Sequence, residues 1–159
     1  YFNRFNNIWH HGDFAEIKET NGLIIHGRSD TTLNPGGVRL GTAEIYTEVE
    51  RFKEVKESIV VGQSWDNDVR IILFIVMNTK FYLTEDLLKK IKFQIKKNAS
   101  PRHVPSKIIQ VKDIPRTKSG KIVELAVKNI LDGNNIKNKE ALANPEALKQ
   151  FKNLKELSN

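Results

Sequence analysis

The sequence predicts an α+β fold, in which a small mixed sheet of about three strands is flanked by helices and preceded by a β-hairpin. Short β-branched runs alternate with segments whose apolar residues recur at helical spacing, and this alternation indicates both element types. The chain has 159 residues, of which 39% are hydrophobic and 28% charged, as is typical of a globular protein. That length is enough for one buried core.

The first element is the hairpin. Two short apolar runs, at residues 14–17 and 23–27, flank Asn21 and Gly22, and an Asn-Gly pair between such runs is a strong hairpin signal. Residues 29–41 follow, with four glycine or proline residues among other turn formers. We expect an irregular loop there and, with it, a domain boundary.

A helix and a second hairpin come next. Thr42 is expected to cap a helix, because apolar residues follow it at positions i, i+4 and i+7 of one face, namely Ile45, Val49 and Phe52. The β-branched runs 55–62 and 69–77 predict two strands joined by a longer loop at residues 64–68. The run 71–77 shows no polar alternation, which predicts the central strand of the sheet.

The remaining elements alternate again. Thr84 is expected to cap a helix whose apolar face comprises Leu87, Leu88, Ile91 and Ile95. Residues 107–111 form a short predicted strand, and residues 122–131 a helix stopped by Gly133. A last helix is predicted after Asn144 as its cap, anchored by Leu148 and Phe151.

The charge is unevenly distributed. The net charge is +7, yet residues 89–128 hold 12 Lys and Arg against only Asp113 and Glu124, a local charge of +10. Such a surface suits a phosphate-rich ligand, which could be a nucleotide, a coenzyme or nucleic acid, although a solvated lysine-rich face is equally compatible. A nucleic-acid-binding module is the rival from another class. It is disfavoured because Phe93 is the one aromatic residue in this stretch.

Several classes of protein and site are excluded. The absence of cysteine removes disulfide scaffolds, thiolate metal sites and cysteine nucleophiles. The longest apolar run, 71–77, is too short to span a membrane, and no secretory signal opens the chain, so we expect a cytoplasmic protein. His10 and His11 would point to opposite faces of a strand, so we expect no metal site. The start at Tyr1 suggests a piece of a longer protein.

Three motifs remain: His-Gly-Asp at residues 11–13, the glycine-rich stretch 27–41, and Pro-Arg-Thr-Lys-Ser-Gly-Lys at residues 115–121. Each also has a purely structural interpretation, since Asp and Gly favour turns. The third motif is similar to the end of a phosphate-binding P-loop. It fails that comparison because Pro115 occupies the first glycine position and Ile122 replaces the Ser or Thr.

Taken together in this order and spacing, the motifs resemble the C-terminal signature segments of the adenylate-forming enzymes, the superfamily of acyl-CoA synthetases. The run NPGGVRLGTAEIY at residues 34–46 and the tail 138–148 are similar to the branch that activates acetoacetate. Acetate-activating members usually carry Ser-Gly-His-Arg where residues 36–39 read Gly-Gly-Val-Arg. Another acyl or aryl acid remains the alternative substrate.

The resemblance implies two parts. Residues 1–29 would end a large N-terminal domain, and residues 30–159 would form the small C-terminal domain. It further implies an ATP-dependent ligase that joins acetoacetate and CoA through an acyl-adenylate, with Mg²⁺ accompanying ATP and with domain rotation between the half-reactions. The phosphate loop and the acyl pocket would lie in the missing N-terminal domain, so the fragment alone is expected to be inactive.

The resemblance also assigns roles to single residues. Lys121 would be the adenylation lysine and, as such, a target for a protein acetyltransferase that neutralises it. The alternative is that Lys121 is an ordinary surface lysine. Asp13 and Arg28 would bind ATP, Asp30 would be the hinge, and the CoA-binding residues would be Gly37, Arg39 and Lys96.

Overall fold

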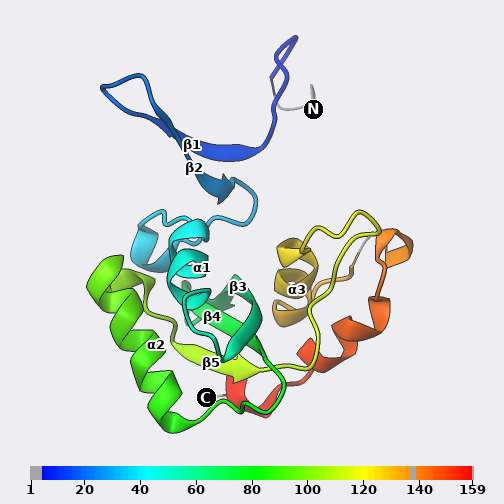
Figure 1. The fold of residues 1–159 in the computed structure, drawn as a ribbon. Helices are drawn as coiled ribbons and strands as arrows, with labels where there is room; N and C mark the ends of the chain where they lie inside the picture. The colour runs from blue at the N-terminus through cyan, green and yellow to red at the C-terminus, as the bar shows by residue number, and fades with distance from the viewer. Residues whose placement is uncertain (1–4, 137–138, 159) are drawn as a thin grey trace.

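A three-stranded mixed sheet lies at the centre of the molecule, as predicted (Figure 1). The computed structural model describes residues 5–136 and 139–158. The strands are β3 (Val55–Trp65), β4 (Asp68–Met77) and β5 (Lys107–Gln110), in the order β3-β4-β5. β3 pairs antiparallel with β4, and β5 pairs parallel with it. The predicted central strand is therefore confirmed.

Helices cover both faces of this sheet. α1 (Ala43–Val49) and α2 (Glu85–Asn98) pack on one face, against alternate β4 residues such as Leu73. α3 (Glu124–Leu131) and the C-terminal segment pack on the other face, against the intervening residues such as Phe74. Burial on both faces explains why the sequence of β4 is apolar without alternation. Each fully buried Ile, Leu or Phe contributes about 1.5–3 kcal/mol to folding.

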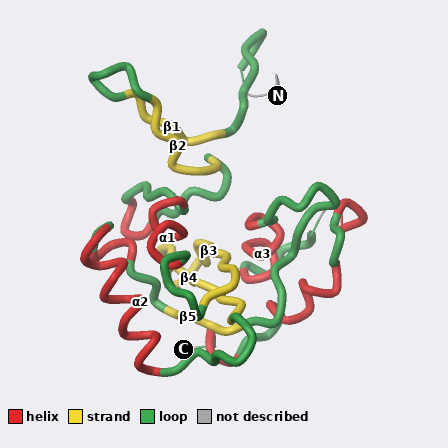
Figure 2. The backbone as a smooth tube through the Cα atoms, in the orientation of Figure 1, coloured by secondary structure: helices red, strands yellow, loops and turns green. Residues whose placement is uncertain are grey.

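The N-terminal hairpin projects from this body and contacts it where β2 meets the start of α1 (Figures 1 and 2). It consists of β1 (Asp13–Ile17) and β2 (Leu23–Arg28), which pair antiparallel as predicted and are joined by residues 18–22, a loop that contains the Asn-Gly pair. Several of its apolar side chains are exposed, the most open being Ile17 and Leu23.

The segment between the hairpin and α1 is irregular, as expected, and contains the 3₁₀ turn η1 (Pro35–Gly37). The prediction for Thr42 is wrong: its backbone is already helical and its side chain caps nothing. Its hydroxyl instead lies so close to Gly27 that a Cβ there would come within 2.9 Å of Oγ1. α1 ends at Val49, before Phe52, which still packs on the same core.

The connection between β3 and β4 also differs from the prediction. Pairing continues to Trp65 and Asp68, so the expected longer loop is a two-residue turn. Asp66 and Asn67 both have positive φ, 49° and 58°, which Asp and Asn tolerate and which matches the twist of a tight hairpin. The strands are consequently longer than their apolar runs.

Two further corrections concern the C-terminal part. α3 begins at Glu124 because Ile122 is drawn into a bridge with Arg116. The last predicted helix is a 3₁₀ segment, η4 (Pro145–Phe151), and Asn144 does not cap it. The Asn144 side chain instead hydrogen-bonds to residues in the range 113–116. Single 3₁₀ turns complete the chain: η2 (Pro101–His103), η3 (Lys139–Ala141) and η5 (Lys155–Leu157).

The cap at Thr84 is confirmed, since its Oγ1 accepts the Leu87 N–H at 3.3 Å. We expect Thr84→Ala to lower the free energy of unfolding by about 1 kcal/mol because that N–H loses its partner. Urea denaturation measures this change. The control is Thr47→Ala, which removes an exposed hydroxyl inside α1 and should stay within about 0.5 kcal/mol of wild type. Equal losses in both variants would contradict the capping role.

Candidate functional site

The structure brings three of the sequence-predicted site residues together where the hairpin meets the segment that follows it. Asp13 and Arg28 lie opposite each other in the β1–β2 register. The Arg28 guanidinium donates from Nε and Nη2 to the two carboxylate oxygens of Asp30, at 3.2 and 3.1 Å. Its Nη1 lies 3.9 Å from Asp13 Oδ1. The proposed hinge carboxylate is therefore paired with the proposed ATP-binding arginine.

The backbone at residues 11 and 12 packs directly against the Arg28 side chain. Gly12 has a φ of +93°, and a Cβ there would stand 3.0 Å from Arg28 Nη2. Arg28 also donates to the His11 carbonyl, and the Ser29 N–H donates to the Gly12 carbonyl at 2.8 Å. The first motif thus needs its glycine both for backbone conformation and for space. The Asp13 side chain is 27% exposed, and its Oδ2 lies 2.6 Å from Nδ1 of the exposed His11 side chain.

Lys121 lies at the end of a fixed turn. The Thr117 N–H donates to the Lys121 carbonyl at 2.9 Å, and the Lys121 N–H donates back to Thr117 Oγ1 at 3.1 Å. Gly120 provides the positive φ of +83° that the turn requires. The Lys121 side chain is exposed, and among the described residues no carboxylate pairs with its ammonium.

A half-buried hydrogen-bond pair ties the helix that follows this turn to the rest of the fold. The Tyr46 hydroxyl donates to Glu124 Oε1 at 2.5 Å and accepts the Val60 N–H at 3.1 Å. Burial, together with the neighbouring Glu124 carboxylate, raises the pKa of Tyr46 well above its usual value. The first residue of α3 is thereby tied to α1 and β3. No sequence pattern indicates this pair, since its members are far apart in the chain.

The residues expected to bind CoA are placed differently. Gly37 has a φ of +76°, and apart from its chain neighbours no atom of the described residues lies within 4 Å of where its Cβ would stand. Arg39 lies over the Phe14 ring of the hairpin, 5.4 Å from its centroid. Lys96 is exposed in the last turn of α2. In Figure 1, η1 and α2 lie on the left, whereas the loop leading into α3, which holds Lys121, lies on the right.

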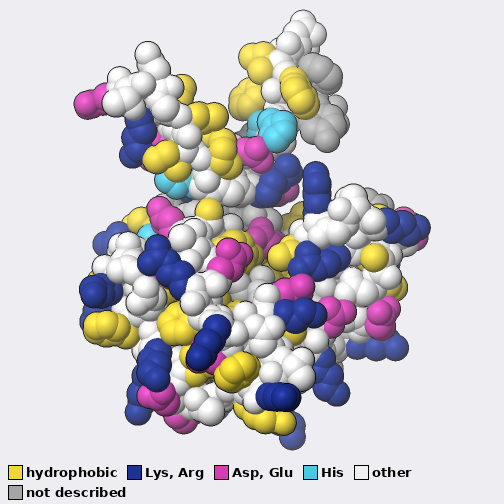
Figure 3. Space-filling model, viewed as in Figure 1, with side chains coloured by type: hydrophobic (Ala, Val, Ile, Leu, Met, Phe, Trp, Pro, Cys, Tyr) yellow, Lys and Arg dark blue, Asp and Glu magenta, His cyan; other side chains and the backbone are white. Residues whose placement is uncertain are grey.

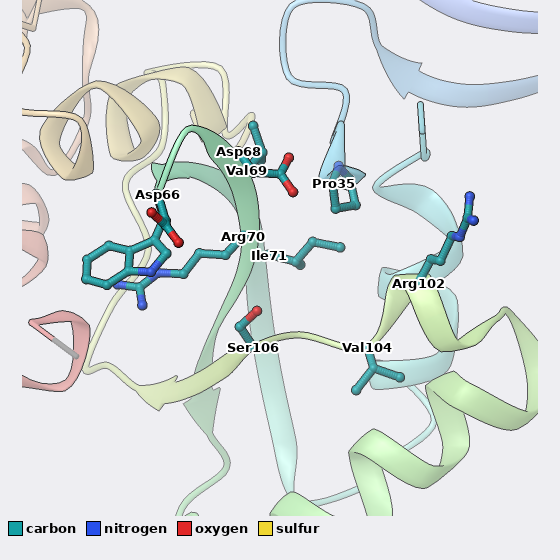
Figure 4. Close-up of a pocket in the computed structure, with 10 residues that line it drawn as sticks. Pro35, Asp66, Asp68, Val69, Arg70, Ile71, Arg102, Val104 and Ser106 are labelled. Carbon is teal, nitrogen blue, oxygen red and sulfur yellow. The ribbon is translucent and has the colours of Figure 1, made fainter. Parts of the chain in front are cut away.

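A pocket of about 410 Å³ opens beside η1 (Figure 4). Pro35 and Arg102 lie on one side of it, and Asp68 and Arg70 on the other. Asp68 also fixes the glycine turn, because both of its carboxylate oxygens accept the Gly36 N–H, at 2.9 and 3.0 Å. No sequence pattern indicates a role for Asp68, which falls in the predicted loop 64–68.

The cations of the basic stretch lie on several elements: α2, the connector after it, β5, the Lys121 turn and α3. On the side of the molecule that Figure 3 shows, Lys and Arg are mixed with acidic side chains. In the part of the chain that the structure describes, no three His, Asp or Glu side chains gather as metal ligands. Within the same residues, no helix has both the length and the apolar run needed to cross a bilayer.

Comparison with known proteins identifies the relatives. The profile of the AMP-binding enzyme C-terminal domain matches residues 44–121. Acetoacetyl-coenzyme A synthetase of Rhizobium meliloti (strain 1021) is 60% identical over the whole chain, and acetoacetyl-CoA synthetase of Xenopus tropicalis is 47% identical. Over its whole length the chain is similar to the C-terminal part of acetoacetyl-CoA synthetases. It spans 24% of the length of each of these two relatives.

A solved structure agrees with this assignment. Acetoacetyl-CoA synthetase from Streptomyces lividans superposes with a TM-score of 0.85 and 38% identity, over 95% of this chain and 23% of that protein. The predicted family and fold class are therefore confirmed. The roles of Asp13, Arg28, Asp30, Gly37, Arg39, Lys96 and Lys121 stay predictions.

The close approach of the Arg28 guanidinium to Gly12 leads to a prediction. Gly12→Ala introduces a Cβ at an unfavourable φ and against the Arg28 guanidinium, so the Ser29 N–H···O bond to residue 12 should open more often. We expect hydrogen exchange of the Ser29 amide to accelerate about tenfold or more, which NMR measures. Gly22→Ala is the control, because its Cβ would make only an ordinary 3.5 Å contact with Thr20. Unchanged Ser29 exchange in Gly12→Ala would contradict the argument.

Proposed function

We propose that this chain is the hairpin and small domain of an ATP-dependent acid–thiol ligase, which makes acetoacetyl-CoA, AMP and pyrophosphate from acetoacetate, ATP and CoA. The observation that carries the proposal is the Lys121 ammonium, unpaired by any described carboxylate and presented on a fixed turn away from the Gly37 loop. Two separate faces suit two half-reactions that occur in turn at one centre. The names of the relatives support acetoacetate as the acid.

The division into residues 1–29 and 30–159 is part of this proposal. The exposed apolar side chains of the hairpin, among them Ile17, Leu23 and Ile25, favour a large domain packed against it. That domain would hold the phosphate loop and the acid pocket. A different acyl or aryl acid is the alternative substrate, since the pocket that selects the acid would lie in the large domain and not in this chain.

ATP would bind at the cluster of Asp13, Arg28 and Asp30, where the hairpin meets the segment after it. The Asp13 carboxylate can accept hydrogen bonds from the two ribose hydroxyls, and the planar Arg28 guanidinium can donate to the same sugar or to phosphate. Arg28 would then exchange its pairing with Asp30 for the nucleotide. Mg²⁺ would accompany ATP and neutralise phosphate charge, held chiefly by the large domain.

In the first half-reaction, a carboxylate oxygen of acetoacetate attacks the α-phosphorus and pyrophosphate leaves. Both reactants are anionic, so their approach is opposed by charge repulsion. The Lys121 ammonium, on a long side chain at the end of its turn, would stabilise the oxygens that gather negative charge. It transfers no proton in this role.

In the second half-reaction, the CoA thiol attacks the acyl carbonyl and AMP leaves. The small domain would first rotate about Asp30, which brings the Gly37 loop to the centre in place of the Lys121 turn. Gly37 would leave room for the pantetheine arm, because the space beside it is open. Arg39 would leave the Phe14 ring to contact phosphate, and Lys96 would contact the nucleotide of CoA.

This activity would belong to the cytoplasmic use of a ketone body in lipid and fatty acid metabolism. A protein acetyltransferase acting on Lys121 would switch it off, because acetylation removes the charge on which adenylation depends. The exposure of Lys121 is compatible with such a modifying enzyme.

The decisive test of the proposal is Lys121→Ala in the full-length protein. We expect acetoacetate-dependent pyrophosphate release to fall at least ~100-fold, since one preorganised charge is worth about 3 kcal/mol in the transition state. Thioester formation from supplied acetoacetyl-adenylate should be spared, because the thiol meets a neutral carbonyl. Lys118→Ala is the matched control, an exposed lysine of the same turn.

The outcomes of this test are distinct. An equal loss in both half-reactions would indicate misfolding, and no loss in either would make Lys121 an ordinary surface lysine. A similar loss in Lys118→Ala would assign the effect to general charge rather than to position.

The division of the protein gives another prediction. The chain alone should release no pyrophosphate from ATP with acetoacetate, because the phosphate loop and acid pocket would lie elsewhere. The full-length protein should do so faster with acetoacetate than with acetate or benzoate. A pyrophosphate-release assay measures both, and turnover by the chain alone would refute the two-domain interpretation.

A further inference from the structure

Arg116 lies at the base of the Lys121 turn and contacts two different elements. Its Nη1 donates to the Gly120 carbonyl at 2.8 Å, the peptide that precedes Lys121. Its Nη2 pairs with Glu57 Oε2 on β3 at 3.1 Å. One planar guanidinium therefore joins the turn directly to the central sheet.

This arrangement differs from an ordinary surface ion pair, which contributes little. The Arg116 and Glu57 side chains are only 31% and 26% exposed. The two Nη atoms bind the Gly120 carbonyl and the Glu57 carboxylate at the same time. A lysine ammonium cannot reproduce this planar arrangement of two donors. Glu57 orients the guanidinium, and the guanidinium fixes the orientation of the 120–121 peptide.

The backbone of Arg116 is held from the other side. Its N–H donates to Asn144 Oδ1 at 2.8 Å, and its carbonyl accepts the Ala143 N–H at 2.8 Å. Asn144 in turn donates to Asp113 Oδ2 and to the Ile114 carbonyl, at 2.6 and 2.9 Å. Arg116 thus has both its main chain and its side chain fixed, while the Lys121 side chain it supports has no carboxylate partner among the described residues.

We infer that Arg116 is a positioning residue for Lys121, acting through the Gly120 carbonyl and oriented by Glu57. The inference rests on the proposed function, in which the Lys121 ammonium must meet the reacting oxygens. A displacement of about 1 Å in such a group can cost up to ~100-fold in rate. Rigidity at the base of the turn keeps a long, flexible side chain directed to one place.

The experiment compares Arg116→Lys with Arg51→Lys in the full-length protein. Arg51 follows α1, and its Nη2 lies 3.4 Å from Oε1 of Glu48 on that helix. It is a matched control because it also pairs with a glutamate but takes no part in the Lys121 turn. The measurements are kcat and the ATP KM for acetoacetate-dependent pyrophosphate release, and the rate of thioester formation from supplied acetoacetyl-adenylate. Lys121→Ala is assayed in parallel.

We expect Arg116→Lys to lower the adenylation kcat about tenfold, with the ATP KM within about twofold of wild type and thioester formation unchanged. Arg51→Lys should change none of these quantities. Glu57→Gln keeps an acceptor but loses the charge, and it should lower the adenylation kcat by a smaller factor in the same selective way.

Three results would overturn the inference. If Arg116→Lys and Glu57→Gln adenylate at the wild-type rate while Lys121→Ala does not, Arg116 positions nothing and the proposed function stands. If both half-reactions fall together in both variants, the role of Arg116 is structural only. If Lys121→Ala itself adenylates normally, the proposed function fails, and the inference fails with it.

Discussion

Burial of β4 on both faces is the constraint on which the rest of the structure depends. Because its alternate residues face two different cores, helices must cover the sheet on each side. The chain therefore places α1 and α2 on one face and α3 with the C-terminal segment on the other (Figure 1). Loops that leave opposite faces of one sheet end on opposite sides of the domain. The separation of the Gly37 loop from the Lys121 turn results from this layering.

Both proposed faces are built in the same way, with a glycine at positive φ on a turn that a distant side chain fixes. Asp68 holds the N–H of Gly36 beside Gly37, and Arg116 holds the carbonyl of Gly120 beside Lys121. Asp68 is itself the first residue of β4, and Arg116 is paired with Glu57 of β3, so both turns are held by the β3–β4 hairpin. The stiff part of the domain thus supports the parts that would meet substrate. The cluster of Asp13, Arg28 and Asp30 differs, since its partners come from the hairpin and the segment after it.

The sequence predicted what local chemistry and periodicity determine. The Asn-Gly turn, the Thr84 cap and the unbroken apolar run of β4 each carry their signal within a few residues. The predictions for Thr42 and Asn144 were wrong because tertiary partners took over both side chains: packing against Gly27 for one, and three partners in residues 113–116 for the other. The candidate residues came from motif order, and the hairpin register explains why Asp13 meets Arg28. Pairs such as Tyr46 with Glu124 and Arg116 with Glu57 could not be predicted, since no spacing links them.

The parallel pairing of β5 has a consequence for how the domain assembles. β3 and β4 are joined by two residues, so this ribbon can close early and locally, whereas β5 must return across the whole of α2 before it can pair. The chain entropy lost in that closure opposes the β4–β5 pairing more than the β3–β4 pairing. The segment 139–151 then packs both on Phe74 of β4 and on residues C-terminal to β5. The Lys121 turn depends on the same late segment, because the Lys118 N–H donates to the Ala141 carbonyl and the Ala143 N–H donates to the Arg116 carbonyl. A chain that ended before residue 139 would therefore lack part of the second core together with the bonds that hold the Lys121 turn.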